Sequence, residues 1–564
     1  MSPLVRINAL RRNARAIKGN NAVNQMIRSF HIRSSARYGL NLVSSSSLIR
    51  ELNLALLGGG VMMFLTYSYF SDRIPSPLRY MREYSTIHND EGKLIQSSGG
   101  YAKGEESFAI LTDKEVDNRL RSREMSFFVK RSKGITRYDV AQLPSNNPIE
   151  DSHVEKLITF PSPNASSKTL AEREDEEFDN DLYFFGIFDG HSGTFTSAKL
   201  SVDLVPYVAH QIANVYQQNN KALGSKSSQG LSFDSALENG FVQLDNDIIY
   251  GSLGKLLKEP NNDTMLSALP AISGSCALLA IYNSHDSNLK VAVTGDSRAL
   301  IGSVNSNGEW TVESLSTDQT GDNEEEVARI RSEHPGEPNV VRNGRVLGSL
   351  QPSRAFGDYR YKVKEIEGKR LSDLPDHLKL YFRKEPKDFK TPPYVTAKPV
   401  ITTTKISPET KFMVLGSDGL FELLSNAEIA GLVIRWMENN NVNDKNIIAN
   451  GKKGKLPFVK DVSTDTESQR SAFRYRKDGK LEDTSYLMED NNVATHLIRN
   501  ALSAGGQKEY VSTLVSIPAP TSRKYRDDLT VTVAFFGEIK KDSVSDDNSI
   551  VLNHDATTPP KSKL

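Results

Sequence analysis

Short apolar runs alternate with polar stretches through the middle of the chain, and their lengths predict strands. These runs are residues 182–188, 276–283, 289–302, 411–416 and 529–537. The first contains no charge, as expected of a strand that is buried on both faces. Helix-like stretches cover 195–216 and 322–333, and in the second Asp322 can be the N-cap with Glu325 completing a capping box.

Strands and helices are mixed without regular βαβ alternation, and no internal repeat is visible. The pattern therefore predicts a largely antiparallel α+β domain. We place this domain at residues 125–537, with polar insertions at 161–181 and 438–490. A linker is expected at 72–124 and a flexible tail at 538–564.

The N-terminal region differs from the rest of the chain. Residues 1–50 contain eight arginines, one lysine, eight serines and no acid, which favours a mitochondrial presequence over a disordered basic tail. No charge falls between Glu51 and Asp72. Residues 51–71, with their apolar stretch 52–70, are therefore expected to be a membrane anchor, or a sorting segment that is later cleaved.

The chain ends in Ser562-Lys563-Leu564, which matches an address read by the peroxisomal import receptor at a free C-terminus.

The formal net charge is zero, so nothing in the composition favours nucleic acid as a partner. The single cysteine, Cys276, excludes an intrachain disulfide and a cysteine-based zinc site. Because it lies in an apolar run, we expect a buried structural thiol.

Acidic residues recur at the predicted strand ends. They are Glu150 and Asp151 in "NNPIEDSH", Asp189 in "FGIFDGHSG", Asp296 in "KVAVTGDSRALIG", Asp418 in "KFMVLGSDGLFELL", and Asp527 and Asp528 in "YRDDLTVTVAFFG". A tight turn explains any one segment. Together they predict a metal site, because clustered carboxylates repel unless cations neutralise them, and oxygen ligands select Mg²⁺ or Mn²⁺.

The order of these segments resembles the metal-dependent Ser/Thr protein phosphatases of type 2C. The matching motifs are the acid pair, D-G-H-x-G, G-D-S-R, S-R-A-x-G-D, D-G-x-[WF] and R-D-[DN], over roughly residues 125 to 537. The resemblance implies a four-layer αββα sandwich, in which two antiparallel sheets are flanked by helices. It implies metal ligands at Asp189, Gly190, Glu150, Asp151, Asp296, Asp418 and Asp527.

The resemblance implies that Asp189 bridges two divalent ions and that Asp296 shares a weaker third ion with Asp418. A water activated by the ions attacks phosphoserine, so no phosphoenzyme forms. His191 is the candidate general acid for the leaving serine. For Arg354 and Asp358, which flank "AFG", we expect an internal ion pair rather than substrate contact.

Several stretches, among them "SEHPGEPNVVRNGRVLGSLQPSRAFGD", resemble the mitochondrial pyruvate dehydrogenase phosphatases within this family. Most family members have Arg, which grips the substrate phosphate, where this chain has Asn146, and this branch shares the departure. The resemblance implies the pyruvate dehydrogenase complex as substrate, and the acid-free residues 1–50 imply the mitochondrial import machinery as a partner. A broader phosphatase of mitochondrial and peroxisomal proteins, or a catalytically inactive scaffold, are the alternatives.

Overall fold

The computed structural model describes residues 87–88, 94–95, 109–131, 133–159, 181–222, 232–440, 456–462, 486–538 and 550–558. The predicted presequence, the stretch 52–70 and the terminal Ser562-Lys563-Leu564 lie outside these ranges. Within them, none of the helices combines the length and the apolar character needed to cross a membrane.

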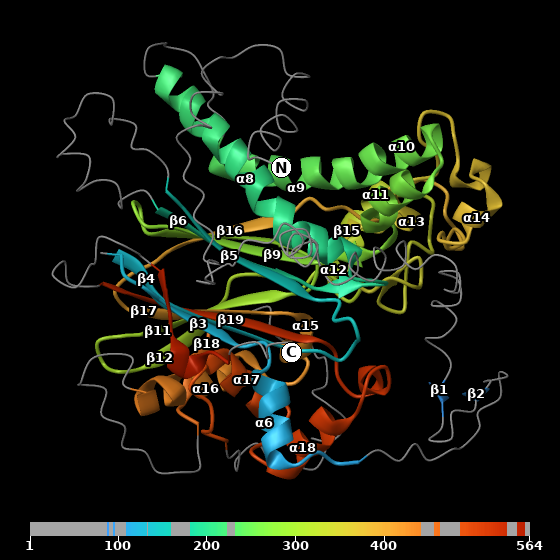
Figure 1. Cartoon of the computed structure of the whole chain (residues 1–564). Coiled ribbons are helices and arrows are strands. Elements are labelled where there is room, and N and C mark those ends of the chain that lie inside the picture. Colours follow the sequence, from blue (N-terminus) through green and yellow to red (C-terminus); the bar gives the residue numbers. More distant parts are fainter. Residues whose placement is uncertain are drawn as a thin grey trace, which may run out of the picture.

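Two stacked sheets form the centre of the molecule (Figure 1). The five-stranded sheet has the order β16 (Val400–Lys405), β10 (Asn288–Thr294), β9 (Ala277–Asn283), β6 (Asp181–Phe188) and β5 (Ser152–Thr159). The eight-stranded sheet has the order β18 (Val459–Asp461), β12 (Trp310–Ser314), β11 (Arg298–Val304), β17 (Thr410–Gly416), β19 (Leu529–Glu538), β4 (Lys133–Leu143), β3 (Met125–Val129) and β20 (Ile550–Leu552). All these pairings are antiparallel except that of β12 with β18.

Helices cover the outer face of each sheet (Figure 1). The five-stranded sheet is covered by α8 (Phe195–Ala222), α9 (Phe233–Asn246), α10 (Ser252–Lys258) and α11 (Asn262–Ile272). The eight-stranded sheet is covered by α6 (Asp113–Arg121), α16 (Asn426–Asn440), α17 (Val493–Ala501) and α18 (Lys508–Ser516). The predicted four-layer αββα sandwich is confirmed.

The alternation of side chains along each strand explains why the strands are apolar throughout. In β6, Tyr183 and Phe185 point into the core between the two sheets, whereas Leu182 and Phe184 pack against the helices. In β17 the inter-sheet core receives Met413. Because both faces of these strands are buried, residues 182–188 and 412–416 carry no charge on either face.

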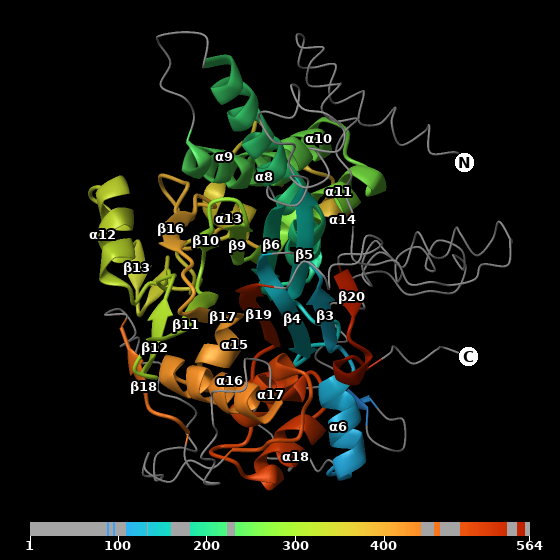
Figure 2. The ribbon, with the colours of Figure 1, turned by 90° about the vertical axis from the view of Figure 1, so that its left-hand side faces the viewer.

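Smaller elements lie beside the sandwich. They are α12 (Glu324–Glu333), the hairpin of β13 (Val341–Arg342) with β14 (Arg345–Val346), α13 (Tyr359–Lys362) and α14 (Asp376–Lys379). A short pair, β1 (Ile87–His88) with β2 (Leu94–Ile95), precedes the domain. Figure 2 shows α12 and β13 at the side of the sandwich opposite to β20. The N-cap of α12 is Asn323, whose side chain accepts from the backbone of Glu325 and Glu326, so the predicted cap at Asp322 is wrong.

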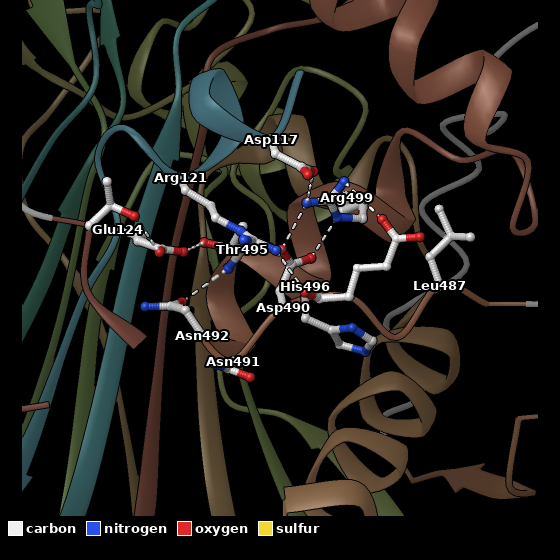
Figure 3. Close-up of polar contacts among 12 residues, drawn as sticks. Asp117, Arg121, Glu124, Leu487, Asp490, Asn491, Asn492, Thr495, His496 and Arg499 are labelled. Carbon is white, nitrogen blue, oxygen red and sulfur yellow. Dashed lines mark hydrogen bonds and ion pairs between the residues drawn. The ribbon is translucent and has the colours of Figure 1, made fainter. Parts of the chain in front are cut away.

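Three structured segments lie where the sequence predicted a linker, an insertion or a tail. Helix α6 packs on α17 and α18, and ion pairs of Arg121 and Asp117 with Asp490 and Arg499 tie it to the domain (Figure 3). Strand β18 pairs with β12, and β20 pairs with β3. These segments are short, and their strand or helix partners are distant in sequence, so local patterns did not reveal them.

Candidate active site

The predicted acidic segments meet at one end of the two sheets. In the eight-stranded sheet Arg298 of β11 pairs with Gly416 of β17, and Gly416 pairs with Val531 of β19. Antiparallel pairing therefore brings three acids to the same edge. They are Asp296 just before β11, Asp418 just after β17 and Asp527 just before β19. In the other sheet Ser152 pairs with Phe188, which places the start of β5 beside the end of β6.

Three carboxylates converge at this edge. Oxygens of Asp189, Asp296 and Asp418 all lie within 4.8 Å of one another, with Asp296 buried and the other two partly exposed. Asp418 is the first residue of α15 (Asp418–Phe421), and Asp296 lies in the turn between β10 and β11. Burial, then the charges of neighbouring carboxylates with Asp418 foremost, raises the pKa of Asp189 well above its usual range.

Asp151 belongs to the same acidic region. It is 4% exposed, and its Oδ2 accepts a hydrogen bond of 2.7 Å from Thr530 Oγ1. Burial and the nearby Asp528 carboxylate raise the pKa of Asp151 to about 8. A group of acids that repel one another suits a divalent cation, because hard ions prefer carboxylate oxygens and neutralise the charge. These residues therefore fit Mg²⁺ or Mn²⁺.

Glu150 and Asp527 lie beside this cluster with other partners. Glu150 Oε1 accepts from the backbone of Gly193 at 2.6 Å, and its Oε2 accepts from Asn146 Nδ2 at 3.1 Å. A Cβ added at Gly419 would lie 3.2 Å from the Cβ of Asp527. Because Gly419 directly follows Asp418, Asp527 lies close to Asp418. The Asp527 carboxylate contacts Arg523.

A three-stranded sheet brings His191 to the acids. Its strands are β15 (Phe356–Gly357), β8 (Gly274–Ser275) and β7 (Gly190–His191), in that order. Gly190 has no room for a side chain, since a Cβ there would lie 2.2 Å from the carbonyl oxygen of Glu150. This close approach explains the glycine of the D-G-H-x-G segment.

His191 Nε2 forms a 2.6 Å hydrogen bond with Asp358 Oδ2, and both groups are largely buried. Burial opposes protonation of the imidazole, but the Asp358 carboxylate, with Asp296 and Glu150, outweighs this effect and raises the pKa of His191. Gly274 lies under this pair, because a Cβ there would approach His191 Nε2 to 2.1 Å.

The expected ion pair between Arg354 and Asp358 is wrong. Arg354 pairs instead with Glu326 at 2.6 Å, while Asp358 pairs with His191. The sequence could not show this, because Glu326 and His191 come from segments that only the tertiary structure brings close. Both pairings are internal, as expected.

Sequence analysis named Asp528 and Asp358 but missed what they do near the site. Asp528 accepts from the backbone of Ser145 at 2.5 Å and of Glu150 at 2.8 Å, so it fixes the segment that carries Glu150. Asp358 was not assigned to His191. The only sequence signals were their places in the R-D-[DN] and S-R-A-x-G-D segments.

Cys276 is buried as predicted, and its Sγ donates to Asp296 Oδ1 at 3.2 Å.

Comparison with known proteins places the chain in a family. The family model for protein phosphatase 2C matches residues 158–454. A Saccharomyces cerevisiae protein, named pyruvate dehydrogenase (acetyl-transferring) phosphatase 1, mitochondrial, is 54% identical and covers 100% of both chains. A protein phosphatase 2C homologue of Schizosaccharomyces pombe is 38% identical over 75% of this chain and 85% of its own.

The human protein named pyruvate dehydrogenase (acetyl-transferring) phosphatase 1, mitochondrial, is 30% identical over 83% of this chain and 91% of its own. The chain therefore belongs to the protein phosphatase 2C family, and it is a metal-dependent protein Ser/Thr phosphatase. Glu150, Asp151 and Asp527 lie outside the stretch matched by the family model, but within the full-length match to the yeast protein.

Proposed function

We propose that this phosphatase hydrolyses phosphoserine on the α subunit of pyruvate dehydrogenase, and so activates that complex. The 54% identity over the full length of the yeast protein, whose name states pyruvate dehydrogenase, supports the proposal. The convergence of Asp189, Asp296 and Asp418 supports the reaction. A catalytically inactive scaffold is disfavoured because Asp189, Asp418 and Asp527 are all present.

The proposed cofactors are two Mg²⁺ or Mn²⁺ ions. Asp189 with the Gly190 carbonyl, Asp418 and Asp527 are the proposed main ligands, with Glu150 and Asp151 on the second ion and Asp296 sharing a weaker third ion with Asp418. Bound ions would supply an acidified water as nucleophile and stabilise negative charge on the phosphate oxygens. Because water is the nucleophile, no side chain becomes phosphorylated.

His191 is the proposed general acid. Because its Nε2 is held by Asp358, the other ring nitrogen, Nδ1, is the one that would donate a proton to the leaving serine oxygen. Asp358 orients the ring and stabilises its charged form. Glu150, bonded to Gly193 and Asn146, fixes the loop on the other side of the acids.

The reaction is tested with the purified full-length protein. We expect release of phosphate from phosphoserine peptides and from the intact phosphorylated complex with Mg²⁺ or Mn²⁺, and no release when both ions are chelated. Full activity in excess chelator would refute the metal assignment. Equal turnover of the complex and of unrelated phosphoproteins would favour the broader specificity.

The role of His191 is tested by His191→Gln. The variant should retain its ions but lose turnover on phosphoserine, and lose least on nitrophenyl phosphate, whose leaving group needs no proton. Retained ions are measured by titration of the protein with Mn²⁺. Equal losses on both substrates would show that His191 is not the acid.

The names of the relatives support a mitochondrial location, in keeping with the acid-free residues 1–50. We also propose a smaller peroxisomal pool directed by Ser562-Lys563-Leu564. In cells with an internally tagged protein, deletion of Leu564 should abolish that pool and leave the mitochondrial signal. A protein that never reaches peroxisomes, even without residues 1–50, would show that the tripeptide is accidental.

A further inference from the structure

A guanidinium group lies directly beside the acids of the active site. It belongs to Arg523, in the 3₁₀ helix formed by Thr521–Lys524, and its Nη1 contacts Asp527 Oδ1. The Arg523 side chain is 42% exposed, so a substrate can reach it. Its positive charge also acts on Glu150, where it partly offsets the burial that raises the pKa of that carboxyl.

Hydrogen bonds hold the Arg523 turn against the segment that carries Asn146. The neighbour of Arg523, Ser522, is 1% exposed and donates through Oγ to the carbonyl oxygen of Ser145 at 2.5 Å. From the other side, Asp528 Oδ1 accepts from the backbone of Ser145 and, at 3.1 Å, from that of Asn146. Arg523 is therefore attached next to the position where Asn146 stands in place of arginine.

Asn146 itself offers little to a phosphate. It is neutral, and its Nδ2 already donates to Glu150 Oε2 at 3.1 Å. Glu150, Asp527 and Asp528 repel a phosphorylated side chain that approaches them, and a cationic side chain among them reduces this repulsion in addition to the proposed ions. Arg523 contacts Asp527 through one nitrogen, and a guanidinium carries five N–H donors, so donors remain for two phosphate oxygens.

We infer that Arg523 binds the phosphoryl group of the substrate and supplies, from the turn next to Asn146, the positive charge that Asn146 lacks. The inference rests on the proposed phosphatase reaction and adds a specificity-determining residue to it. Because Arg523 lies in the turn Thr521–Lys524, the position of this turn determines the orientation in which phosphoserine binds.

The test measures binding of inorganic phosphate to the full-length, Mn²⁺-loaded protein by calorimetry, and hydrolysis of a phosphoserine peptide. Arg523→Gln should weaken phosphate binding about tenfold and raise KM more than it lowers kcat, because a charge-assisted contact is lost. Lys524→Gln is the matched control: it removes the same charge one position away and should change binding less than about twofold. Thermal unfolding checks that both variants fold.

Asn146→Arg in the Arg523→Gln background should restore phosphate binding, because it returns a guanidinium to the neighbouring segment. The inference is overturned if Arg523→Gln binds phosphate like Lys524→Gln in a protein that hydrolyses phosphoserine with Mn²⁺. It is also overturned if Arg523→Gln only tightens Mn²⁺ binding, since Arg523 would then be a counter-ion of Asp527 alone. Absence of metal-dependent hydrolysis in the unaltered protein would instead refute the proposed function.

Discussion

Two clusters of buried charge in this protein have opposite compositions. At the active-site edge Asp189, Asp296 and Asp418 face one another with their carboxylates. In the cluster around Arg499, shown in Figure 3, the Asp490 carboxylate is held by Arg499 Nε at 2.6 Å and by Arg121 Nη2 at 3.0 Å. Asp490 and Arg499 are both almost completely buried, and Asp117 and Glu489 add further acids around the Arg499 guanidinium.

The two clusters shift the pKa of their acids in opposite directions. Burial opposes ionisation of Asp490, but its bonds to Arg499 outweigh this and lower the pKa of Asp490. At the active site burial and like charges act together, and the pKa values of Asp189 and Asp151 are raised. Acids that are paired with buried arginines stay ionised in the fold, and loss of one partner is costly, whereas an acid cluster that lacks such cations needs an external ion.

The largest effect is expected from Asp189→Asn. Turnover should fall about a thousandfold, because charge stabilisation at the phosphate depends on this carboxylate. In chelator the melting temperature should stay equal or rise, since one of three repelling carboxylates is gone. Asp490→Asn is the control with the reverse outcome, a lower melting temperature with turnover per folded molecule retained. Loss of stability in Asp189→Asn would contradict the distinction between the clusters.

Arg499→Met should lower the free energy of unfolding by about 3–5 kcal/mol, because it leaves the buried Asp490 without its main partner. Urea unfolding measures this loss. The control is Lys199→Met, which breaks a surface pair with Asp203 and should cost less than about 1 kcal/mol. Similar losses in both variants would show that the Arg499 cluster is not a structural brace.

The two regions should also give opposite pH dependence. Burial lowers the pKa of His496, beside Asp490, to about 4 from 6.5, so the unfolded chain takes up the proton first and stability falls between about pH 6.5 and 4. The pKa of Asp151 is raised from 3.8 to about 8, so its contribution is complete below pH 3.8 and is lost as pH rises towards about 8.

Urea unfolding in chelator between pH 4 and 9 tests this expectation. Between about pH 4 and 6.5 the His496 and Asp151 slopes have opposite signs and cancel. From about pH 6.5 to 8 only the Asp151 slope remains, and the free energy of unfolding should decline by up to about 1.4 kcal/mol per pH unit. His496→Gln should uncover a decline that runs from about pH 4 to 8, whereas Asp151→Asn should uncover a rise from about pH 4 to 6.5 and remove the decline above it. An unchanged slope in either variant would assign that decline to other groups.

Gly274→Ala tests how the active site is held. The new Cβ would approach His191 Nε2 and Asp358 Oδ2 to 2.1 and 2.3 Å, so this pair must move. We expect a loss of turnover of about tenfold or more, since a small displacement of a reacting group is costly. Gly254→Ala in α10 is the control, because its Cβ meets only Ile366 at 3.7 Å and alanine favours the helix. Equal turnover in both would contradict this role of Gly274.

The smallest effect is expected from Cys276→Ser. Burial, with Asp296 and Asp189 nearby, raises the pKa of the Cys276 thiol well above its usual range, so it is not a thiolate nucleophile. A serine hydroxyl can make the same donation to Asp296. Turnover with Mn²⁺ should therefore change less than about twofold, and a complete loss would place the thiol in the reaction.

The strands and the acids at their ends were predictable from the sequence because their signals are local. Buried apolar runs such as 182–188 and 411–416 identify strands, and an acid followed by glycine identifies the turn that ends them. The antiparallel α+β class followed from the same runs, whereas the sandwich and the set of candidate ligands followed from the resemblance to the family motifs. The N-cap of α12 was missed by one position, because neighbouring polar residues compete for the same cap.

Which residues touch was decided by the tertiary structure. His191 meets Asp358, 167 positions later in the chain, and this pairing depends on the register of β7, β8 and β15. The same holds for Arg499, which pairs with Asp490 and with Asp117 of α6. An acid that will face other acids and one that will face arginines look alike in sequence, because the difference between them is made by strand register and by helix packing between distant segments.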